Sequence, residues 1–233
     1  MSRICLDYGH GGSDPGAVYK GRKEKDDVLK VGLEVAKILR SYGVLVDETR
    51  TADKTVSLKE RSDMENKKTY DYFISFHRNA FKPEQANGVE TFTYINQTEK
   101  AKSLADRIQK ELVKIGFKDR GVKKANFHVL RETKAPAVLV EIGFIDNSKD
   151  NQLFDSKFAE IAISISRVIL LQLGVEYKLS QTNPPPTPTQ PTSNNQTLYR
   201  VMAGSYSVRE NAENQVAKLK KAGFDATIMI FKP

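Results

Sequence analysis

Short apolar runs alternate with amphipathic stretches along the first three quarters of the 233-residue chain, and this alternation constrains the fold more than any other feature. The apolar runs are rich in β-branched and aromatic residues, as strands are, and they cover residues 3–8, 44–49, 72–76, 89–95 and 137–142. The stretches with helical spacing cover residues 23–42, 98–115 and 156–173, and each is followed by a glycine of the kind that ends a helix. The pattern predicts an α/β domain with a mainly parallel, twisted sheet that is flanked by helices on both faces.

A proline-rich segment separates this pattern from a short C-terminal part. Residues 180–197 hold five of the nine prolines and no charged side chain. Such a stretch favours an extended polyproline II backbone and cannot bury a core. We therefore expect a first domain over residues 1–177, a linker over 178–197 and a small βαβ unit over 198–233.

Two of the three histidines stand in segments that suit a metal site. His10 lies in LDYGHGGSDPGA, where glycines leave room for a metal and a substrate, and His77 lies in SFHRNA. Each follows a strand-like run, so we expect each imidazole to emerge at the end of a strand. The ends of parallel strands are where α/β folds usually place their binding residues.

Two glutamates complete a set that is typical of zinc hydrolases: two histidines, a metal-binding carboxylate and a free carboxylate. Glu24 lies at the expected start of the first long helix, where a solvated acid is the alternative. Glu141 is the single acid of an otherwise apolar run. Because burying an unpaired carboxylate is costly, a position facing a metal or a cleft is favoured over a structural ion pair.

Together these segments resemble the zinc-dependent N-acetylmuramoyl-L-alanine amidases of the amidase-3 type. The similar motifs are LDYGHGGSDPGA, the Glu24 region, SFHRNA and PAVLVEIGFIDN, and the match spans residues 3–173. The resemblance implies hydrolysis of the amide between N-acetylmuramic acid and the first L-alanine of the peptidoglycan stem peptide. It also implies that His10, Glu24 and His77 hold one Zn²⁺ ion and that Glu141 is the catalytic glutamate.

Four further residues near these motifs are candidates for support or substrate contact. Asn79 matches the family pattern and either supports the site or contacts the substrate. Arg78 stands where a small or apolar residue is usual, so it either clamps a peptide carboxylate or points to solvent. His128 is interpreted as a partly exposed structural histidine, with substrate binding as the alternative. Arg61 is expected to form an ion pair that fixes the fold.

The C-terminal unit resembles the first half of a SPOR-type domain, through YRVMAGSYS and the helix expected over residues 209–222 between two strands at 198–203 and 227–231. The resemblance implies binding to peptidoglycan glycan strands, with Tyr199, Tyr206 and Phe224 as candidates for stacking on sugars. For Phe224, a place in the small core of the unit is at least as plausible. The usual domain has two βαβ halves. We therefore expect this half-unit to pair with a second copy in a homodimer, to dock on the catalytic domain, or to bind weakly.

Composition and net charge limit the classes of partner that are plausible. The net charge of +8 favours an anionic partner, but no basic helix or aromatic–basic ribbon indicates nucleic acid, and anionic cell-wall polymers are at least as plausible. The N-terminus lacks a signal peptide pattern, and no run approaches the roughly 18 apolar residues of a membrane span. We therefore expect synthesis in the cytoplasm, and action on the wall after lysis or passage through a holin, as a phage endolysin or a mother-cell autolysin. Cys5, the only cysteine, is expected to be a buried and inert thiol.

Two other functions remain open from the residues alone. A zinc peptidase or carboxypeptidase on a similar scaffold would cut the stem peptide itself. A wall-binding protein with an inactive catalytic module is less compatible with the retention of all four polar residues of the expected site.

Overall fold

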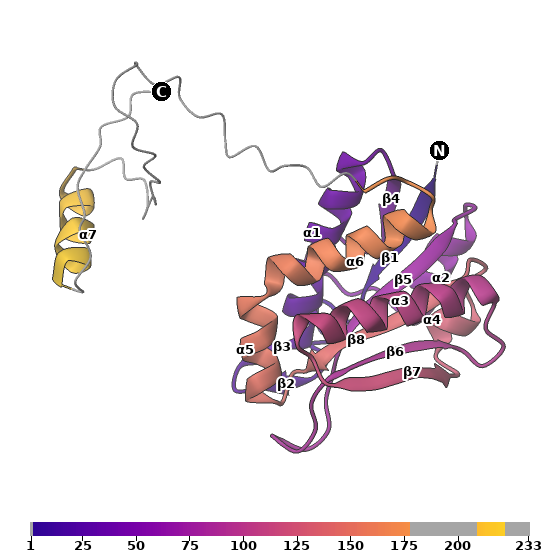
Figure 1. The fold of residues 1–233 in the computed structure, drawn as a ribbon, viewed down its shortest axis with the longest axis horizontal. Helices are drawn as coiled ribbons and strands as arrows, with labels where there is room; N and C mark the ends of the chain where they lie inside the picture. Colours follow the sequence, from indigo (N-terminus) through magenta and orange to yellow (C-terminus); the bar gives the residue numbers. More distant parts are fainter. Residues whose placement is uncertain (1, 178–208, 222–233) are drawn as a thin grey trace. The chain divides into compact units, whose positions relative to one another are not determined.

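The computed structural model describes residues 2–177 and 209–221. The chain divides into two compact units, residues 1–180 and 181–233. In the second unit the helix α7 (Arg209–Lys221) confirms the helix expected over 209–222 (Figure 1). The expected linker and the two expected strands of the C-terminal unit lie outside the described residues.

A six-stranded sheet forms the centre of the first unit, in the order β4-β1-β5-β8-β6-β7 (Figure 1). Its strands are β1 (Arg3–Tyr8), β4 (Leu45–Glu48), β5 (Tyr72–Asn79), β6 (Val89–Tyr94), β7 (Asp119–Ala125) and β8 (Ala137–Phe144). Strands β4, β1, β5 and β8 are mutually parallel, whereas β6 is antiparallel to β8 and parallel to β7. The carboxyl ends of the four parallel strands therefore meet the amino ends of β6 and β7 at one edge. The prediction of a mainly parallel sheet is confirmed.

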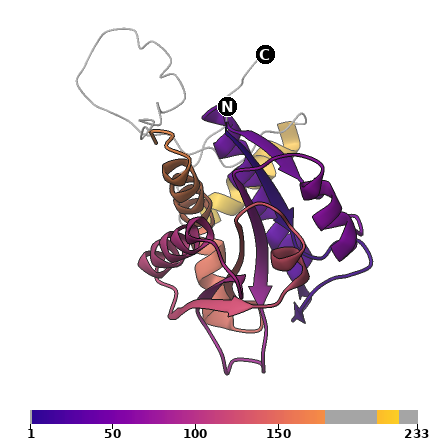
Figure 2. The same cartoon turned by 90° about the vertical axis from the view of Figure 1, so that its right-hand side faces the viewer.

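Helices cover both faces of the sheet, as expected. Neighbouring helices α1, α6 and α3 cross one face (Figure 1), and the shorter helices α2 and α4 pack on the other. The helices of this unit are α1 (Glu24–Ser41), α2 (Leu58–Asn66), α3 (Glu99–Ile115), α4 (His128–Arg131), α5 (Ser148–Ser156) and α6 (Phe158–Gln172). Figure 2 shows the same layers after a quarter turn. A separate hairpin joins β2 (Val18–Tyr19) to β3 (Arg22–Lys23) just before α1.

Side chains alternate between two cores along each central strand, because successive residues of a strand point to opposite faces. In β1, Ile4 and Leu6 are buried in the larger core under α1, α3 and α6, whereas Cys5 is buried in the smaller core with Phe73. Burial raises the pKa of the Cys5 thiol well above its usual value, so the thiol stays protonated. The expectation of a buried, unreactive cysteine is confirmed.

Two strands of the six-stranded sheet differ most from the expectation. Strand β5 continues three residues beyond its expected end at Phe76, and β7 was not expected at all. The sequence of β7, DRGVKKA, is charged and lacks alternating apolar residues. It is an edge strand, and polar and lysine-rich edges are common because they discourage pairing with other chains.

A buried ion pair joins the end of β1 to α2. Arg61 Nη1 donates to Asp7 Oδ1 at 2.6 Å and to the carbonyl oxygen of Tyr8 at 2.7 Å, and Nη2 donates to the carbonyl oxygen of His10 at 2.7 Å. Burial alone would raise the pKa of Asp7. The charge of Arg61 and hydrogen bonds that include one from Ser75 outweigh burial and hold this pKa below its usual value. The fold-fixing ion pair predicted for Arg61 is confirmed.

Replacement of Arg61 by alanine should lower the free energy of unfolding by about 3–5 kcal/mol, because it leaves the Asp7 carboxylate buried without its cation. Urea denaturation measures this loss. The exposed Lys59 on the same helix provides the control, since Lys59→Ala should change stability by less than about 1 kcal/mol.

The same pair should make stability depend on acid. The pKa of Asp7 is lowered in the folded state from the ordinary 3.8, so its stabilisation is present above that value and is lost as pH falls below it. Between about pH 5 and pH 2, Asp7→Asn should therefore lose less stability than the wild type. Parallel stability profiles for the two proteins would contradict this account.

Candidate metal centre and catalytic carboxylate

Three side chains from separate segments meet at the sheet edge where the parallel strands end. Glu24 Oε1 lies 3.1 Å from Nε2 of His10 and 2.9 Å from Nδ1 of His77. One ligand atom from each of the three residues lies within 4.8 Å of the others. His10 belongs to the loop after β1, Glu24 is the first residue of α1 and His77 lies in β5. The structure thus brings together the three side chains that the sequence singled out.

Glu24 is held from several directions. Its Oε2 accepts a hydrogen bond from the backbone N–H of Ala17 at 3.0 Å, and its Oε1 accepts one from the backbone N–H of Arg78 at 3.0 Å. Burial alone would raise the pKa of Glu24, but its hydrogen bonds with His10 and His77 outweigh burial and lower the pKa well below its usual value. Because Glu24 is only 4% exposed, the alternative of a solvated acid at the helix start is wrong.

The backbone around His10 is shaped to present the imidazole. His10 has a φ of 59°, in the left-handed region that residues with a side chain rarely adopt. Its Nδ1 lies 2.8 Å from Asp14 Oδ2, which leaves Nε2 directed at Glu24. Burial acts to lower the pKa of His10, but the bonds and charges of Glu24 and Asp14 raise it to about 9.

Glycines make room for both imidazoles. A Cβ atom on Gly9 would lie 2.3 Å from Cε1 of His77, and one on Gly16 would lie 2.7 Å from both Cδ2 of His10 and Oε2 of Glu24. Distances this short do not occur between real side chains, so glycine is required at these positions. Gly9 and Gly16 therefore pack directly against the side chains of the site.

Glu141 lies beside this cluster on the neighbouring strand. Its Cα pairs in register with that of His77 across β8 and β5. Its Oε2 is buried and accepts no hydrogen bond from any described residue. Burial raises the pKa of Glu141 to about 7, against the opposing charge of His77. A carboxyl group with this pKa and an unused oxygen is suited to accept and return a proton near neutral pH.

We expected His77 to follow the end of its strand. Instead, it lies within β5, which continues to Asn79. This shift moves Arg78 to the opposite face, toward α1 and α5. Arg78 is 1% exposed, donates to Asp27 Oδ2 at 2.6 Å and to Asn151 Oδ1 at 2.7 Å, and stacks on Phe154. Both predictions for Arg78, a peptide clamp and a solvent-exposed cation, are wrong.

Asn79 supports a second buried acid, Glu90, which was not predicted from the sequence. Its Nδ2 donates to Glu90, and its Oδ1 accepts from the backbone N–H of Ala80 at 2.8 Å. Glu90 is 4% exposed and pairs in register with Glu141 across β6 and β8. Glu90 could have been found by the signal that indicated Glu141. It too is a single acid in a strand-like run without other charges.

His128 lies at the start of α4, where Nε2 is 3.1 Å from Oγ of Ser62 on α2. The side chain is half-buried between these two helices. This is the environment expected for a partly exposed structural histidine, and a contact with substrate stays a prediction.

Comparison with known proteins identifies the family. The sequence profile of the N-acetylmuramoyl-L-alanine amidases matches residues 4–170. The chain belongs to this family, and it is an enzyme of the hydrolase class. The SPOR domain profile matches residues 177–230, so the family resemblance of both parts of the chain is confirmed.

Individual relatives agree with this assignment. The chain is 34% identical to the sporulation-specific N-acetylmuramoyl-L-alanine amidase of Bacillus subtilis (strain 168), over 99% of this chain and 85% of that protein. It is 42% identical to the endolysin of Bacillus phage SPP1, over 70% of this chain and 63% of the endolysin. The catalytic domain of the amidase CwlV from Bacillus (Paenibacillus) polymyxa var. colistinus has a similar structure, with a TM-score of 0.70 and 35% identity, covering 76% of this chain and 100% of that domain.

Substitution of Gly16 by alanine should weaken the binding of a divalent metal ion by about tenfold or more, because the added Cβ displaces His10 and Glu24. Gly21 is the matched control, since it also has a positive φ (81° against 66° for Gly16) but no atom lies within 4 Å of its Cβ position. Titration calorimetry of metal-free protein measures both variants. Equal losses of affinity in Gly16→Ala and Gly21→Ala would show that backbone strain, and not the clash, is responsible.

Proposed function

We propose that this amidase is zinc-dependent and that it hydrolyses the amide between N-acetylmuramic acid and L-alanine in peptidoglycan. The observation that carries the proposal is the meeting of His10, Glu24 and His77 beside Glu141. Two imidazoles and a carboxylate are donors that catalytic zinc favours, and this set leaves one position for water. The donor set therefore fits the ion, and the unpaired Oε2 of Glu141 lacks a hydrogen bond that a water in the site would supply.

The residues around the site would have separate roles in the reaction. When bound, zinc lowers the pKa of water and favours negative charge on the carbonyl oxygen of the lactyl group. Glu141 accepts the proton of the attacking water and delivers it to the alanine nitrogen as the C–N bond breaks. Asp14, through its contact with Nδ1 of His10, fixes Nε2 as the ligand atom.

The C-terminal unit is proposed to hold the enzyme on glycan strands, which the SPOR match over residues 177–230 supports. Tyr199, Tyr206 and Phe224 stay candidates for stacking on sugars, and a homodimer through this unit stays a prediction; all three residues lie outside the described part of the chain. No helix of the described residues has the length and hydropathy of a membrane span. Similarity to a sporulation-specific amidase and to a phage endolysin supports each of the two settings considered, a mother-cell autolysin and an endolysin.

Digestion of purified cell walls tests the bond that is cut. Mass spectrometry should find intact stem peptides with free alanine amines, and a chelator should stop their release until Zn²⁺ is added back. Fragments cut within the stem would indicate a peptidase instead. Binding without release of any peptide would indicate an inactive wall-binding module.

Glu141→Gln should reduce this activity by about a hundredfold or more, since the amide cannot act as a general base. Zinc content and wall binding should stay normal in the variant. Glu99→Gln, which removes an exposed acid at the start of α3, is the control and should leave turnover unchanged. Wild-type turnover in Glu141→Gln would rule out the role proposed for this residue.

Truncation near Pro185 tests whether the first unit cleaves the substrate and the C-terminal unit binds the wall. The shortened protein should stay soluble and folded, cleave small muropeptides like the full chain, and bind intact walls less well, because the proposed wall-binding part is lost. Sedimentation with purified walls measures the binding. Aggregation of the truncated protein would mean that the C-terminal part belongs to the fold of the first unit.

A further inference from the structure

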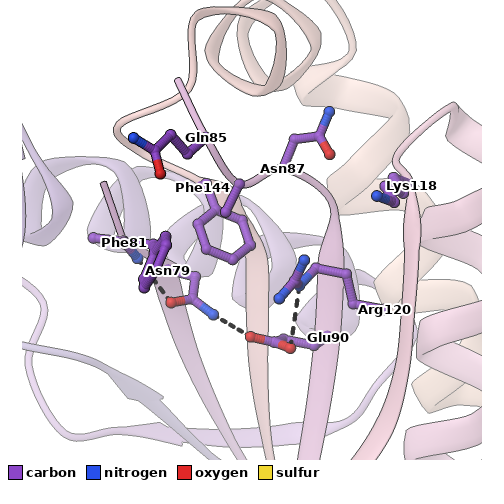
Figure 3. A pocket seen from close by; sticks show the side chains of 10 residues that line it. Asn79, Phe81, Gln85, Asn87, Glu90, Lys118, Arg120 and Phe144 are labelled. Carbon is purple, nitrogen blue, oxygen red and sulfur yellow. Dashed lines mark hydrogen bonds and ion pairs between the residues drawn. The ribbon is translucent and has the colours of Figure 1, made fainter. Parts of the chain in front are cut away.

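A cavity of about 430 Å³ opens at the same sheet edge, and Glu90 of its wall is the register partner of Glu141. Its wall is formed by Asn79 at the end of β5, residues 80, 81 and 85–87 of the loop that follows, Glu90 on β6, Lys118 and Arg120 around the start of β7, and Phe144 at the end of β8 (Figure 3). We call this cavity the β7 pocket. No role in the reaction described above uses it.

The β7 pocket begins one strand beyond Glu141. The Cα atoms of Glu90 and Glu141 are register partners on neighbouring strands, and such strands lie about 4.8 Å apart. Phe144, on the pocket wall, belongs to the same strand as Glu141. A group bound at Glu141 therefore reaches the pocket within one or two extended residues, each about 3.5 Å long.

The position of the proton donor sets the direction of the substrate. Glu141 must reach the alanine nitrogen to protonate it, so the leaving peptide starts on the Glu141 side of the cluster. His10 follows β1 and His77 lies in β5, while β8, β6 and β7 come next on the other side in the sheet order. The stem peptide thus extends toward the β7 pocket, and the sugar extends toward β1.

The charges in the β7 pocket suit an anionic ligand. Its single acid, Glu90, is buried and is already contacted by Asn79, by Nε of Arg120 at 3.3 Å and by Lys123. Two cations of β7, Arg120 of the pocket wall and Lys123 outside the lining, therefore face one carboxylate. Lys118 adds a third positive charge at the rim, where its Nζ has no ion-pair partner among the described residues.

Arg120 is placed to bind that ligand. Its guanidinium stacks on Phe144, with Cζ 4.8 Å from the ring centroid, and only its Nε is bonded to Glu90 (Figure 3). Neither terminal nitrogen has a hydrogen-bond partner in the described part of the chain. A guanidinium held flat with both terminal nitrogens free can bind a carboxylate through two parallel hydrogen bonds.

We propose that the β7 pocket binds the stem peptide on the leaving side of the scissile amide and that Arg120 pairs with a carboxylate of that peptide. This proposal rests on the proposed function, because it uses the proton transfer by Glu141 to orient the substrate. It makes Arg120 a specificity-determining residue that does not take part in the bond cleavage. Arg120 of the edge strand β7 thereby takes the role of peptide clamp that was expected of Arg78.

Arg120→Gln provides the test, because glutamine removes the charge and keeps a donor for Glu90. Three synthetic muramoyl tripeptides with an acidic second residue are the substrates: one unmodified, one amidated at the second residue and one amidated at the C-terminus. For the unmodified substrate the variant should raise KM about ten- to hundredfold, the usual effect of losing a charged hydrogen bond, with kcat within about twofold of wild type. The difference from wild type should vanish for the substrate that lacks the recognised carboxylate, which identifies its source.

Several outcomes would overturn the proposal. An equal rise in KM for all three substrates, no rise at all, or a loss confined to kcat would each exclude a carboxylate clamp at Arg120. A wild-type protein that cleaves none of the tripeptides would count against the proposed function instead. Lys124→Gln, a loss of the same charge from the same strand outside the pocket, should leave all KM values unchanged.

A second pair of variants covers the case in which Arg120→Gln does not fold. Arg120→Lys keeps the charge but loses the two-pronged geometry, and Lys118→Gln changes only an exposed side chain at the rim. Both should raise KM for the unmodified tripeptide and leave KM for the substrate without the recognised carboxylate at its wild-type value. Wild-type KM values in both variants would reject the pocket as the peptide site.

Discussion

Glu24, the first residue of α1, joins the loop after β1 to strand β5, because its two oxygens accept hydrogen bonds from both of these segments. A carboxylate in so little solvent is stable only when it is bonded on all sides. Two buried ion pairs support this point from opposite faces of the sheet. Asp7 and Arg61 fix the end of β1 against α2, while Asp27 and Arg78 fix β5 against α1. The positions of His10 and His77 therefore depend on charges that are neutralised in pairs beneath them.

The two glutamates of the site have the same side chain, but their surroundings shift their pKa values in opposite directions. Hydrogen bonds to the two imidazoles lower the pKa of Glu24 and keep it ionised. Burial raises the pKa of Glu141, whose Oε2 has no hydrogen bond from the described residues. Environments that separate the pKa values of two nearby carboxylates are a common way to separate their roles. Here one carboxylate is suited to hold a cation permanently and the other to exchange a proton.

Much of this arrangement could be predicted from the sequence. The parts that could not be predicted depend on contacts with other segments of the chain. The apolar periodicity located β1, β6, β8 and the long helices closely, and the scarcity of histidine pointed to His10 and His77. Strand β7 was missed because a solvent-facing edge strand is held by its neighbour β6 and needs no apolar pattern of its own. Arg78 was misjudged because three unrecognised residues of β5 decide which face its side chain takes. The burial of Glu24 depends on segments far away in the chain, which no local pattern encodes.

The left-handed backbone of His10 has an evolutionary consequence. A residue with a Cβ atom in this conformation costs roughly 1–2 kcal/mol relative to the right-handed regions, and His10 adopts it at a φ of 59°. Glycine would adopt the same backbone without that cost but could not bind a cation. Selection for thermal robustness and selection for turnover thus oppose each other at a single residue, as is common where catalytic groups are held in strained positions.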